Sequence, residues 1–283
     1  MSSWHGGRLE HSQAAWVWAR LPEPVLIADM SWDLVESVVL HVGTADGDVI
    51  VKAGGAANHH IGREIAAHAG WTAPLEATGH AARLLDSSAE ERVMLLEHLP
   101  GALVEGTDAE WHPSTYAQAG ALLRRLHAGE QRTDAGHERR ANERALTWLA
   151  GVHRVDPASA ARARGILLAD PAPPVTVVPT HGDWQPRNWL VEDGTVRVID
   201  FGRFAFRPAA TDFTRLAAQQ WRQDPALEAA FLAGYGGDPR RRDRWRIDAL
   251  REAVGTACWA FQVREESFEA QGHRMIVEAL GAF

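Results

Sequence analysis

The 283-residue sequence is poor in several features, and each shortage excludes a class of protein. A single cysteine, Cys258, cannot close an intramolecular disulfide or build a cysteine-rich metal site, so nothing points to an oxidising compartment. No stretch approaches the roughly 18 apolar residues of a membrane span, and residues 1–20 lack the apolar segment of a signal peptide. We therefore expect a cytoplasmic protein that does not bind membranes.

Short motifs of several common enzyme classes are also missing. The sequence has no Gly-Lys pair for a Walker loop, no Gly-x-Gly-x-x-Gly, no Gly-x-Ser-x-Gly and no His-Glu-x-x-His. These absences disfavour P-loop NTPases, dinucleotide-binding oxidoreductases, serine hydrolases and zinc proteases.

Positive charge is in deficit, because 29 Lys and Arg residues stand against 37 Asp and Glu residues, a net charge of −8. This balance disfavours nucleic acid as a partner and favours small cationic molecules. The Arg-rich run at 240–246 is interleaved with aspartates, which is typical of a solvated helix face.

Lysine is almost absent, since Lys52 is the only one in the chain and the other 28 basic residues are arginines. A lone lysine in such a sequence indicates a site that needs a compact ammonium in place of a planar guanidinium. The alternative is one surface lysine retained by chance.

Hydrophobic periodicity divides the chain into a strand-rich first part and a helical second part. We predict strands at 25–28, 38–42, 49–52, 81–85 and 92–96, a helix from Asn58 to Gly70, and a connector at 97–101. Helices are predicted at 113–129 and 142–152, with several more in 211–283. This order predicts an α+β fold with an antiparallel-sheet lobe at 1–97 and a larger helical lobe at 98–283.

One hairpin interrupts the helical part. Asp193-Gly194 between two apolar runs is a strong two-residue turn signal. Counting back from this turn sets Asn188 opposite Ile199 and beside Asp200. Both side chains offer the oxygen ligands that Mg²⁺ prefers, and Asp183, on the preceding loop, could reach a substrate hydroxyl.

These residues occur in a recognisable order: Lys52, Glu64, His181-Gly182-Asp183, Asn188 and Asp200-Phe201-Gly202. In this respect the chain resembles the aminoglycoside phosphotransferase family, which has the protein-kinase-like fold, over nearly its whole length. The resemblance implies a bilobal small-molecule kinase that uses ATP and Mg²⁺.

The resemblance also implies roles for individual residues. Asp183 corresponds to the catalytic base, Asn188 and Asp200 to the Mg²⁺ ligands, Lys52 to the phosphate-binding lysine and Glu64 to its partner. The backbone from Glu97 to Leu99 corresponds to the hinge that binds adenine, and Asp212 to a structural residue. Glu265, Glu266 and Glu269 correspond to acidic contacts with a cationic substrate, although a solvated helix face explains them equally simply.

Two features depart from the family pattern. No glycine-rich sequence occupies the expected phosphate-binding loop at 29–34, and Arg187 replaces the glycine that often precedes the metal-binding asparagine. Arg187 could approach a phosphate or cap the hairpin.

Two further groups of residues have two possible roles each. Trp184 and Trp189 could stack on a substrate or belong to the core. His59-His60 could bind a metal or lie solvated at a helix start.

We therefore expect an enzyme that transfers the γ-phosphate of ATP to a hydroxyl of a small cationic molecule, with no obligate protein partner. An aminoglycoside or a viomycin-type or capreomycin-type peptide, inactivated by phosphorylation, fits this expectation. The alternatives are a kinase for choline, homoserine or a sugar amine, and a catalytically silent nucleotide-binding module. A protein kinase is disfavoured by His-Gly-Asp in place of His-Arg-Asp.

Overall fold

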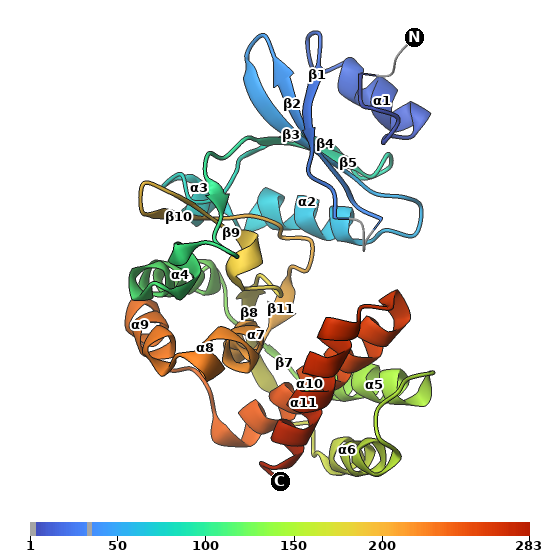
Figure 1. Ribbon diagram of the computed structural model, residues 1–283, viewed down its shortest axis with the longest axis vertical. Helices are drawn as coiled ribbons and strands as arrows, with labels where there is room; N and C mark the ends of the chain where they lie inside the picture. The colour runs from blue at the N-terminus through green and yellow to red at the C-terminus, as the bar shows by residue number, and fades with distance from the viewer. Residues whose placement is uncertain (1–3, 33–35) are drawn as a thin grey trace.

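The computed structural model describes residues 4–32 and 36–283, and it has two lobes, as predicted (Figure 1). The N-terminal lobe holds a five-stranded antiparallel sheet in the order β1-β2-β3-β5-β4. Its strands are β1 (Val25–Asp29), β2 (Val38–Thr44), β3 (Gly47–Ala53), β4 (Leu84–Ser88) and β5 (Val93–Glu97). The helices of this lobe are α1 (His11–Trp18), α2 (His60–Gly70) and α3 (Ala73–Glu76).

The two faces of the sheet bury different side chains, as the alternation in β3 predicts. Val49 and Val51 point to one face, where they pack in a cluster that includes Val17 of α1. Ile50 points to the opposite face, where it packs against a cluster that includes Ile61 of α2. Lys52 has the same parity as Ile50, so its side chain lies on the α2 side of the sheet.

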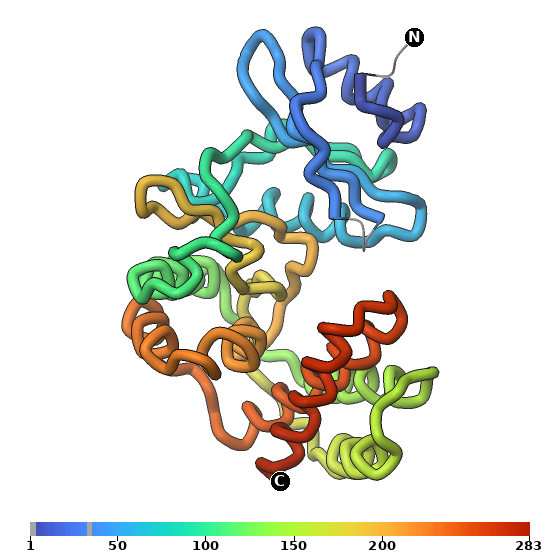
Figure 2. The backbone as a smooth tube through the Cα atoms, in the orientation of Figure 1, coloured from blue at the N-terminus to red at the C-terminus, as the bar shows by residue number. Residues whose placement is uncertain are grey.

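The coils of the tube show that the second lobe is mainly helical (Figure 2). It also contains two three-stranded sheets, ordered β10-β9-β6 and β11-β8-β7. Its α-helices are α4 (Pro113–His127), α5 (His137–Ala150), α6 (Pro157–Ala169), α7 (Thr214–Ala218), α8 (Gln220–Gln223), α9 (Pro225–Tyr235), α10 (Arg242–Val263) and α11 (Glu266–Leu280). Short 3₁₀ helices are η1 (Asp108–Trp111), η2 (Pro186–Asn188) and η3 (Ala209–Phe213). The strands are β6 (Ala102–Leu103), β7 (Arg132–Asp134), β8 (Val175–Thr180), β9 (Trp189–Glu192), β10 (Thr195–Val198) and β11 (Ala205–Arg207).

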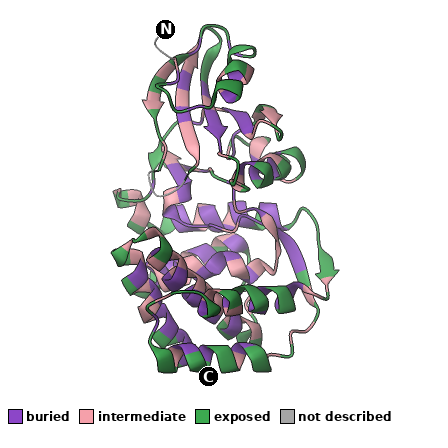
Figure 3. Cartoon of the chain, turned by 90° about the vertical axis from the view of Figure 1, so that its right-hand side faces the viewer, coloured by how far each residue is buried: buried purple, intermediate pink, exposed green. Residues whose placement is uncertain are grey.

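The largest buried cluster lies in this lobe, around α4, α9 and the loop that follows β8 (Figure 3). Trp184 and Trp189 are fully buried in it, so they belong to the core and are not available to stack on a substrate. Two glycines let α4 and α9 approach closely. A Cβ at Gly120 would lie 2.2 Å from the carbonyl oxygen of Phe231, and one at Gly234 would lie 1.9 Å from that of Ala117.

Three predicted boundaries are wrong. The strand expected at 81–85 begins at Leu84, because Ala81 instead forms an isolated bridge with Val198 of the second lobe. Helix α2 begins at His60, two residues after Asn58, although the Asn58 Oδ1 does accept a hydrogen bond from the His60 N–H (2.8 Å). The helix expected at 142–152 is α5, which begins at His137.

In the described part of the chain, no helix combines the length and the apolar character needed to cross a membrane.

Candidate active site

Lys52 forms a buried ion pair that joins the sheet to α2. Its Nζ donates to both carboxylate oxygens of Glu64, at 2.8 and 2.7 Å. It also donates to Oδ1 of Asp200 at 3.1 Å, from the second lobe. Burial lowers the pKa of Lys52, but the Asp200 and Glu64 carboxylates outweigh burial and leave the pKa above its usual value. The only lysine of the chain is therefore held charged between the two lobes.

The loop after β8 takes its shape from a buried aspartate. Oxygens of Asp212 accept hydrogen bonds from the backbone N–H groups of His181 (2.9 Å) and Gly182 (2.6 Å). Gly182 has φ +82°, and a Cβ there would lie 2.4 Å from the carbonyl oxygen of Arg203, so only glycine fits. Asp212 thus has a structural role, as the resemblance implies, because it orders the loop that carries Asp183.

Asp183 lies at the centre of an arginine cluster. Its carboxylate pairs with Arg187 Nη2 at 2.9 Å and with Arg215 Nη1, and it lies 3.9 Å from Arg203 Nε. Burial raises the pKa of Asp183, but Arg215, Arg187 and Arg203 outweigh burial and hold the pKa well below its usual range. Asp183 is therefore ionised at neutral pH. The guanidinium of Arg187 contacts this carboxylate in place of capping the hairpin, and its approach to a phosphate stays a prediction.

The β9–β10 hairpin confirms the predicted register. Glu192 pairs with Thr195, and the N–H of Ile199 donates to the carbonyl oxygen of Asn188 at 3.0 Å. Asp193 and Gly194 both have positive φ, +48° and +74°, as a tight hairpin turn of this length requires. Asp200, which follows Ile199, is accordingly brought to the same end of the hairpin as Asn188.

The chemistry of these two side chains fits a magnesium ion. The Nδ2 of Asn188 donates to the carbonyl oxygen of Asp183 (2.7 Å), which leaves Oδ1 without a donor among the described residues. Partial removal from water raises the pKa of Asp200, but the Lys52 ammonium outweighs it and keeps the pKa below its usual value. An amide oxygen and an ionised carboxylate are hard ligands of the kind that Mg²⁺ prefers.

The segment expected to be a hinge joins β5 to the second lobe. Glu97 ends β5, and Leu99 is buried in the cluster that includes Leu190 of β9. Among the described residues, nothing accepts a hydrogen bond from the Leu99 N–H. This backbone donor is therefore left without a partner among the described residues.

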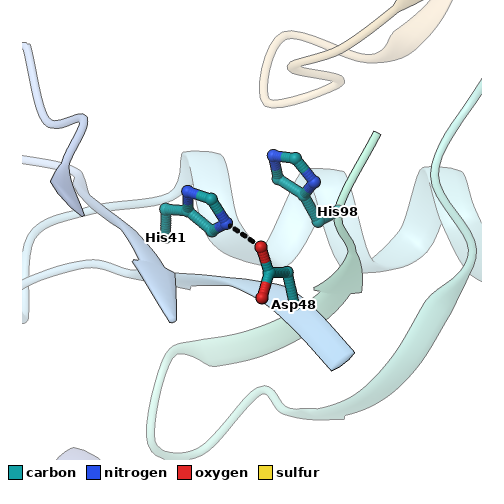
Figure 4. A group of neighbouring side chains, drawn as sticks. All are labelled: His41, Asp48 and His98. Atoms are coloured by element: carbon teal, nitrogen blue, oxygen red, sulfur yellow. Dashed lines mark hydrogen bonds and ion pairs between the residues drawn. The ribbon is translucent and has the colours of Figure 1, made fainter. Parts of the chain in front are cut away.

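A second group of side chains lies beside the hinge (Figure 4). His41 Nε2 is hydrogen bonded to Asp48 Oδ2 at 2.8 Å, and its ring stacks on His98 with centroids 4.2 Å apart and an angle of 2° between the planes. The nitrogen lone pairs of an imidazole lie in its ring plane. Two parallel stacked rings therefore do not direct their lone pairs at one ion, and this arrangement does not favour a metal site.

The three glutamates predicted to contact the substrate do not act as a group. Glu265 Oε1 accepts a hydrogen bond from the Ser267 N–H at 3.2 Å and caps α11. The buried carboxylate of Glu269 is paired with Arg154 at 2.6 Å. Glu266 is exposed to solvent.

Two members of the arginine cluster around Asp183, Arg203 and Arg215, were not predicted from the sequence. Arg203 directly follows Asp200-Phe201-Gly202, and Arg215 lies three residues after Asp212, so each lies close to a residue that was identified. Their approach to Asp183 depends on tertiary packing, which no local pattern reveals.

The expected phosphate-binding loop at 29–34 is partly outside the described residues, because Asp33 and Leu34 are among those not described. The neighbouring Trp32 ring lies 5.1 Å from the guanidinium carbon of Arg187.

Comparisons with known proteins identify the family and the fold of the chain. The sequence model of the phosphotransferase enzyme family matches residues 33–245. A search of curated protein sequences finds no match.

Several solved structures share the fold at low sequence identity. A choline kinase, LicA from Streptococcus pneumoniae, has 12% identity and a TM-score of 0.68 over 95% of this chain and 97% of its own. The aminoglycoside phosphotransferase APH(4)-Ia has 14% identity and a TM-score of 0.71 over 95% and 97%. The macrolide 2'-phosphotransferase MphH from Brachybacterium faecium has 18% identity and a TM-score of 0.55 over 88% and 90%. At these identities the likeness establishes the kinase-like fold.

Proposed function

Because this chain belongs to the phosphotransferase enzyme family, we propose that it transfers the γ-phosphoryl group of ATP to a hydroxyl of a small molecule. The observation that carries the proposal is the convergence of Lys52, Asp183 and Asp200, which come from far apart in the sequence. Lys52 is paired with Asp200, and Asp183 is linked through its carbonyl oxygen to the Asn188 side chain.

In the proposed reaction, the acceptor oxygen forms a bond to the γ-phosphorus as the bond to the bridging oxygen of ADP breaks. The hydroxyl proton passes to the Asp183 carboxylate. A carboxylate with a depressed pKa is a weak base, but phosphoryl transfer through a loose transition state asks mainly for positioning and charge neutralisation. Arg187 and Arg215 hold that carboxylate ionised and oriented.

Nucleotide binding is assigned to the cleft between the lobes. Lys52, oriented by Glu64, would neutralise the phosphates, and the free Leu99 N–H with the Glu97 backbone would bind adenine. Asn188 and Asp200 would hold Mg²⁺, which supplies positive charge next to the transferred phosphoryl group when it is bound. We place the lobe boundary between 1–97 and 98–283, at the end of β5, and the reaction in the cytoplasm, where ATP is made.

The acceptor has two candidate classes. A cationic antibiotic, whose phosphorylation would confer resistance, is supported by the net charge of −8 and by the related fold of an aminoglycoside phosphotransferase solved with hygromycin B. A small metabolite is supported by the related fold of choline kinase. Glu266 is the one predicted acidic contact whose side chain lies exposed for a cation.

The experiment is Mg²⁺-dependent ADP release by wild type and by Asp183→Ala across a panel of both acceptor classes. Turnover of one class by the wild type, lost in Asp183→Ala, is the expected result. A protein that binds ATP without releasing ADP for any acceptor would instead be the silent nucleotide-binding module, the alternative that the absence of a glycine-rich first loop favours.

A further inference from the structure

The carboxylate of Asp183 is surrounded by guanidinium groups. Three guanidiniums, those of Arg187, Arg203 and Arg215, lie within 4 Å of this one carboxylate. The one further carboxylate paired with the three is that of Glu252, 3.1 Å from Arg215, among the residues that the structure describes. These three arginines form one wall of the surroundings of Asp183.

A cavity of about 200 Å³ adjoins this wall, between α5, α10 and the segment that follows β11. Arg144 of α5, Arg207 of β11 and Arg251 of α10 line it. The cavity includes Arg207, which also packs against the catalytic loop, because its Nη1 lies 2.4 Å from the position that a Cβ at Gly182 would occupy. It also reaches Glu252, the partner of Arg215. The cavity thus lies directly behind the residues that hold the proposed base.

The acidic side chains of the cavity are already paired. Asp248 lies 3.0 Å from Arg251, which also pairs with Glu138 at 2.8 Å, and Glu252 pairs with Arg215. These pairs neutralise Arg251 and Arg215 and leave no acidic group for the other arginines.

Arg144 and Arg207 form no ion pair with a carboxylate among the described residues, although Asp212 and Glu143 act on them from a greater distance. Neither has a carboxylate within 4.0 Å in residues 4–32 and 36–283. Arg207 donates only to neutral oxygens, Thr180 Oγ1 at 3.0 Å and the Arg203 carbonyl at 2.8 Å. Burial, together with nearby guanidiniums, outweighs the Asp212 carboxylate and lowers the pKa of Arg207 to about 10, so it remains charged at neutral pH. Arg144 is exposed and Arg207 is partly buried, so both guanidiniums keep N–H donors that no carboxylate pairs with and that an anionic ligand can accept from.

We propose that the acceptor of the phosphoryl group is a small hydroxylated molecule that carries an oxyanion group, carboxylate or phosphate, which Arg144 and Arg207 bind in the cavity. Guanidinium groups suit planar or tetrahedral oxyanions because their N–H donors match the oxygen spacing. The inference rests on the proposed kinase function and narrows its acceptor towards the metabolite class and away from polycationic antibiotics. A cavity of about 200 Å³ is also smaller than the roughly 300–1,000 Å³ that holds a drug-sized ligand.

The first test measures ADP release with acceptors matched in shape and different in charge. The pairs are D-gluconate with D-sorbitol and glycerol 3-phosphate with glycerol, and hygromycin B serves as the polycation. We expect at least a tenfold higher kcat/KM for an oxyanion than for its neutral partner. Equal or better turnover of a neutral acceptor or of hygromycin B would overturn the inference and leave the proposed kinase function in place.

The second test measures binding, so that it also decides the inference if no acceptor of this panel is turned over. D-gluconate and glycerol 3-phosphate are titrated calorimetrically into protein saturated with AMP-PNP and Mg²⁺. We expect Arg144→Gln to weaken oxyanion binding at least tenfold, without a change in AMP-PNP affinity. Arg139→Gln, an exposed arginine on the same helix paired with Glu143, is the matched control and should bind as the wild type does.

Arg144 has no polar partner among the described residues, so its replacement should leave the fold intact. Absence of binding by both oxyanions, or equal affinity in Arg144→Gln and wild type, would contradict the inference. The first test shows separately whether the proposed kinase function fails, because the protein would then release no ADP with any acceptor.

Discussion

At the residue scale, the ion pair of Lys52 and Glu64 is the best-defined feature of the proposed nucleotide site. Both side chains are buried, with 10% and 2% exposure, and the lysine contacts both glutamate oxygens. Removal of one partner of such a pair leaves the other charge buried and uncompensated. Lys52 is the only lysine of the chain, and Glu64 is the only acid between Lys52 and Glu76, so the sequence singled out both members of this ion pair.

We expect Glu64→Gln to raise the KM for ATP about tenfold, because the ammonium loses the group that orients it towards the phosphates. The same change should lower the free energy of unfolding by about 3 kcal/mol. Steady-state kinetics and urea unfolding measure the two effects. Glu90→Gln, an exposed residue of the same lobe, is the control, and a Glu64→Gln enzyme with the KM of that control would refute the role assigned to Glu64.

His137, at the start of α5, makes stability depend on pH. Burial lowers its pKa from 6.5 to about 4. The unfolded chain therefore binds the proton more readily than the folded protein between these values, and the contribution of the neutral ring to stability is lost as pH falls through this window. Relative to His137→Gln, the wild type should lose about 1.4 kcal/mol of unfolding free energy per pH unit below 6.5. Denaturant unfolding from pH 7.5 to 5 measures this, and a difference that does not change with pH would contradict it.

At the element scale, the backbone contact of α4 with α9 anchors the core that carries the catalytic loop. We expect Gly234→Ala to destabilise the protein by several kcal/mol, since its Cβ would meet the Ala117 carbonyl oxygen at 1.9 Å. Gly165→Ala is the matched control, because this glycine lies inside α6 with no atom near its missing Cβ. The control should gain up to about 1 kcal/mol from helix propensity. Thermal unfolding compares them, and equal stability of the two variants would exclude the close contact.

Elements with local signals could be predicted from the sequence, and elements set by distant contacts could not. The Asp193-Gly194 turn fixed the register that brings Asn188 and Asp200 together. Helix α1 was not predicted, because part of what positions it lies far along the chain. Its buried Gln13 side chain donates to the carbonyl oxygens of Gly54 and Glu91. Most of the sheet lobe followed from alternation, whereas the start of β4 depended on a bridge to the second lobe.

The candidate site likewise contains residues that could be predicted from the sequence and residues that could not. The residues that the family motif contains, such as Asp183, could be identified from the sequence, and so could Lys52 from composition. The arginine cluster could not, because Arg203 and Arg215 reach Asp183 only when β11, η3 and α7 are packed beside the catalytic loop. Charges that meet through tertiary structure leave no periodic pattern in the sequence.

At the scale of the whole molecule, the two lobes are joined through charged groups in the cleft. The Lys52 contact with Asp200 crosses from the sheet lobe to the helical lobe at 3.1 Å. A nucleotide bound there would contact both lobes and stabilise the whole folded protein. At a concentration of 100 times its Kd, such a ligand adds about 2.7 kcal/mol to the free energy of unfolding.

We therefore expect Mg²⁺ with AMP-PNP to raise the Tm of the wild type and to have a much smaller effect on Lys52→Met. Differential scanning calorimetry at matched nucleotide concentration measures both shifts. Arg63→Met, an exposed basic residue on α2, is the control and should keep the wild-type shift. An undiminished shift in Lys52→Met would place the nucleotide elsewhere.

The central claim is that Asp183 is the base of a phosphoryl-transfer reaction in a cleft that binds nucleotide without it. Its most direct test is kcat for ADP release, measured beside AMP-PNP affinity, in Asp183→Asn and in the exposed turn variant Asp193→Asn. We expect kcat to fall between about 100-fold and 10,000-fold in Asp183→Asn, with nucleotide affinity within a few-fold of wild type and no change in Asp193→Asn. Full activity in Asp183→Asn would contradict the account.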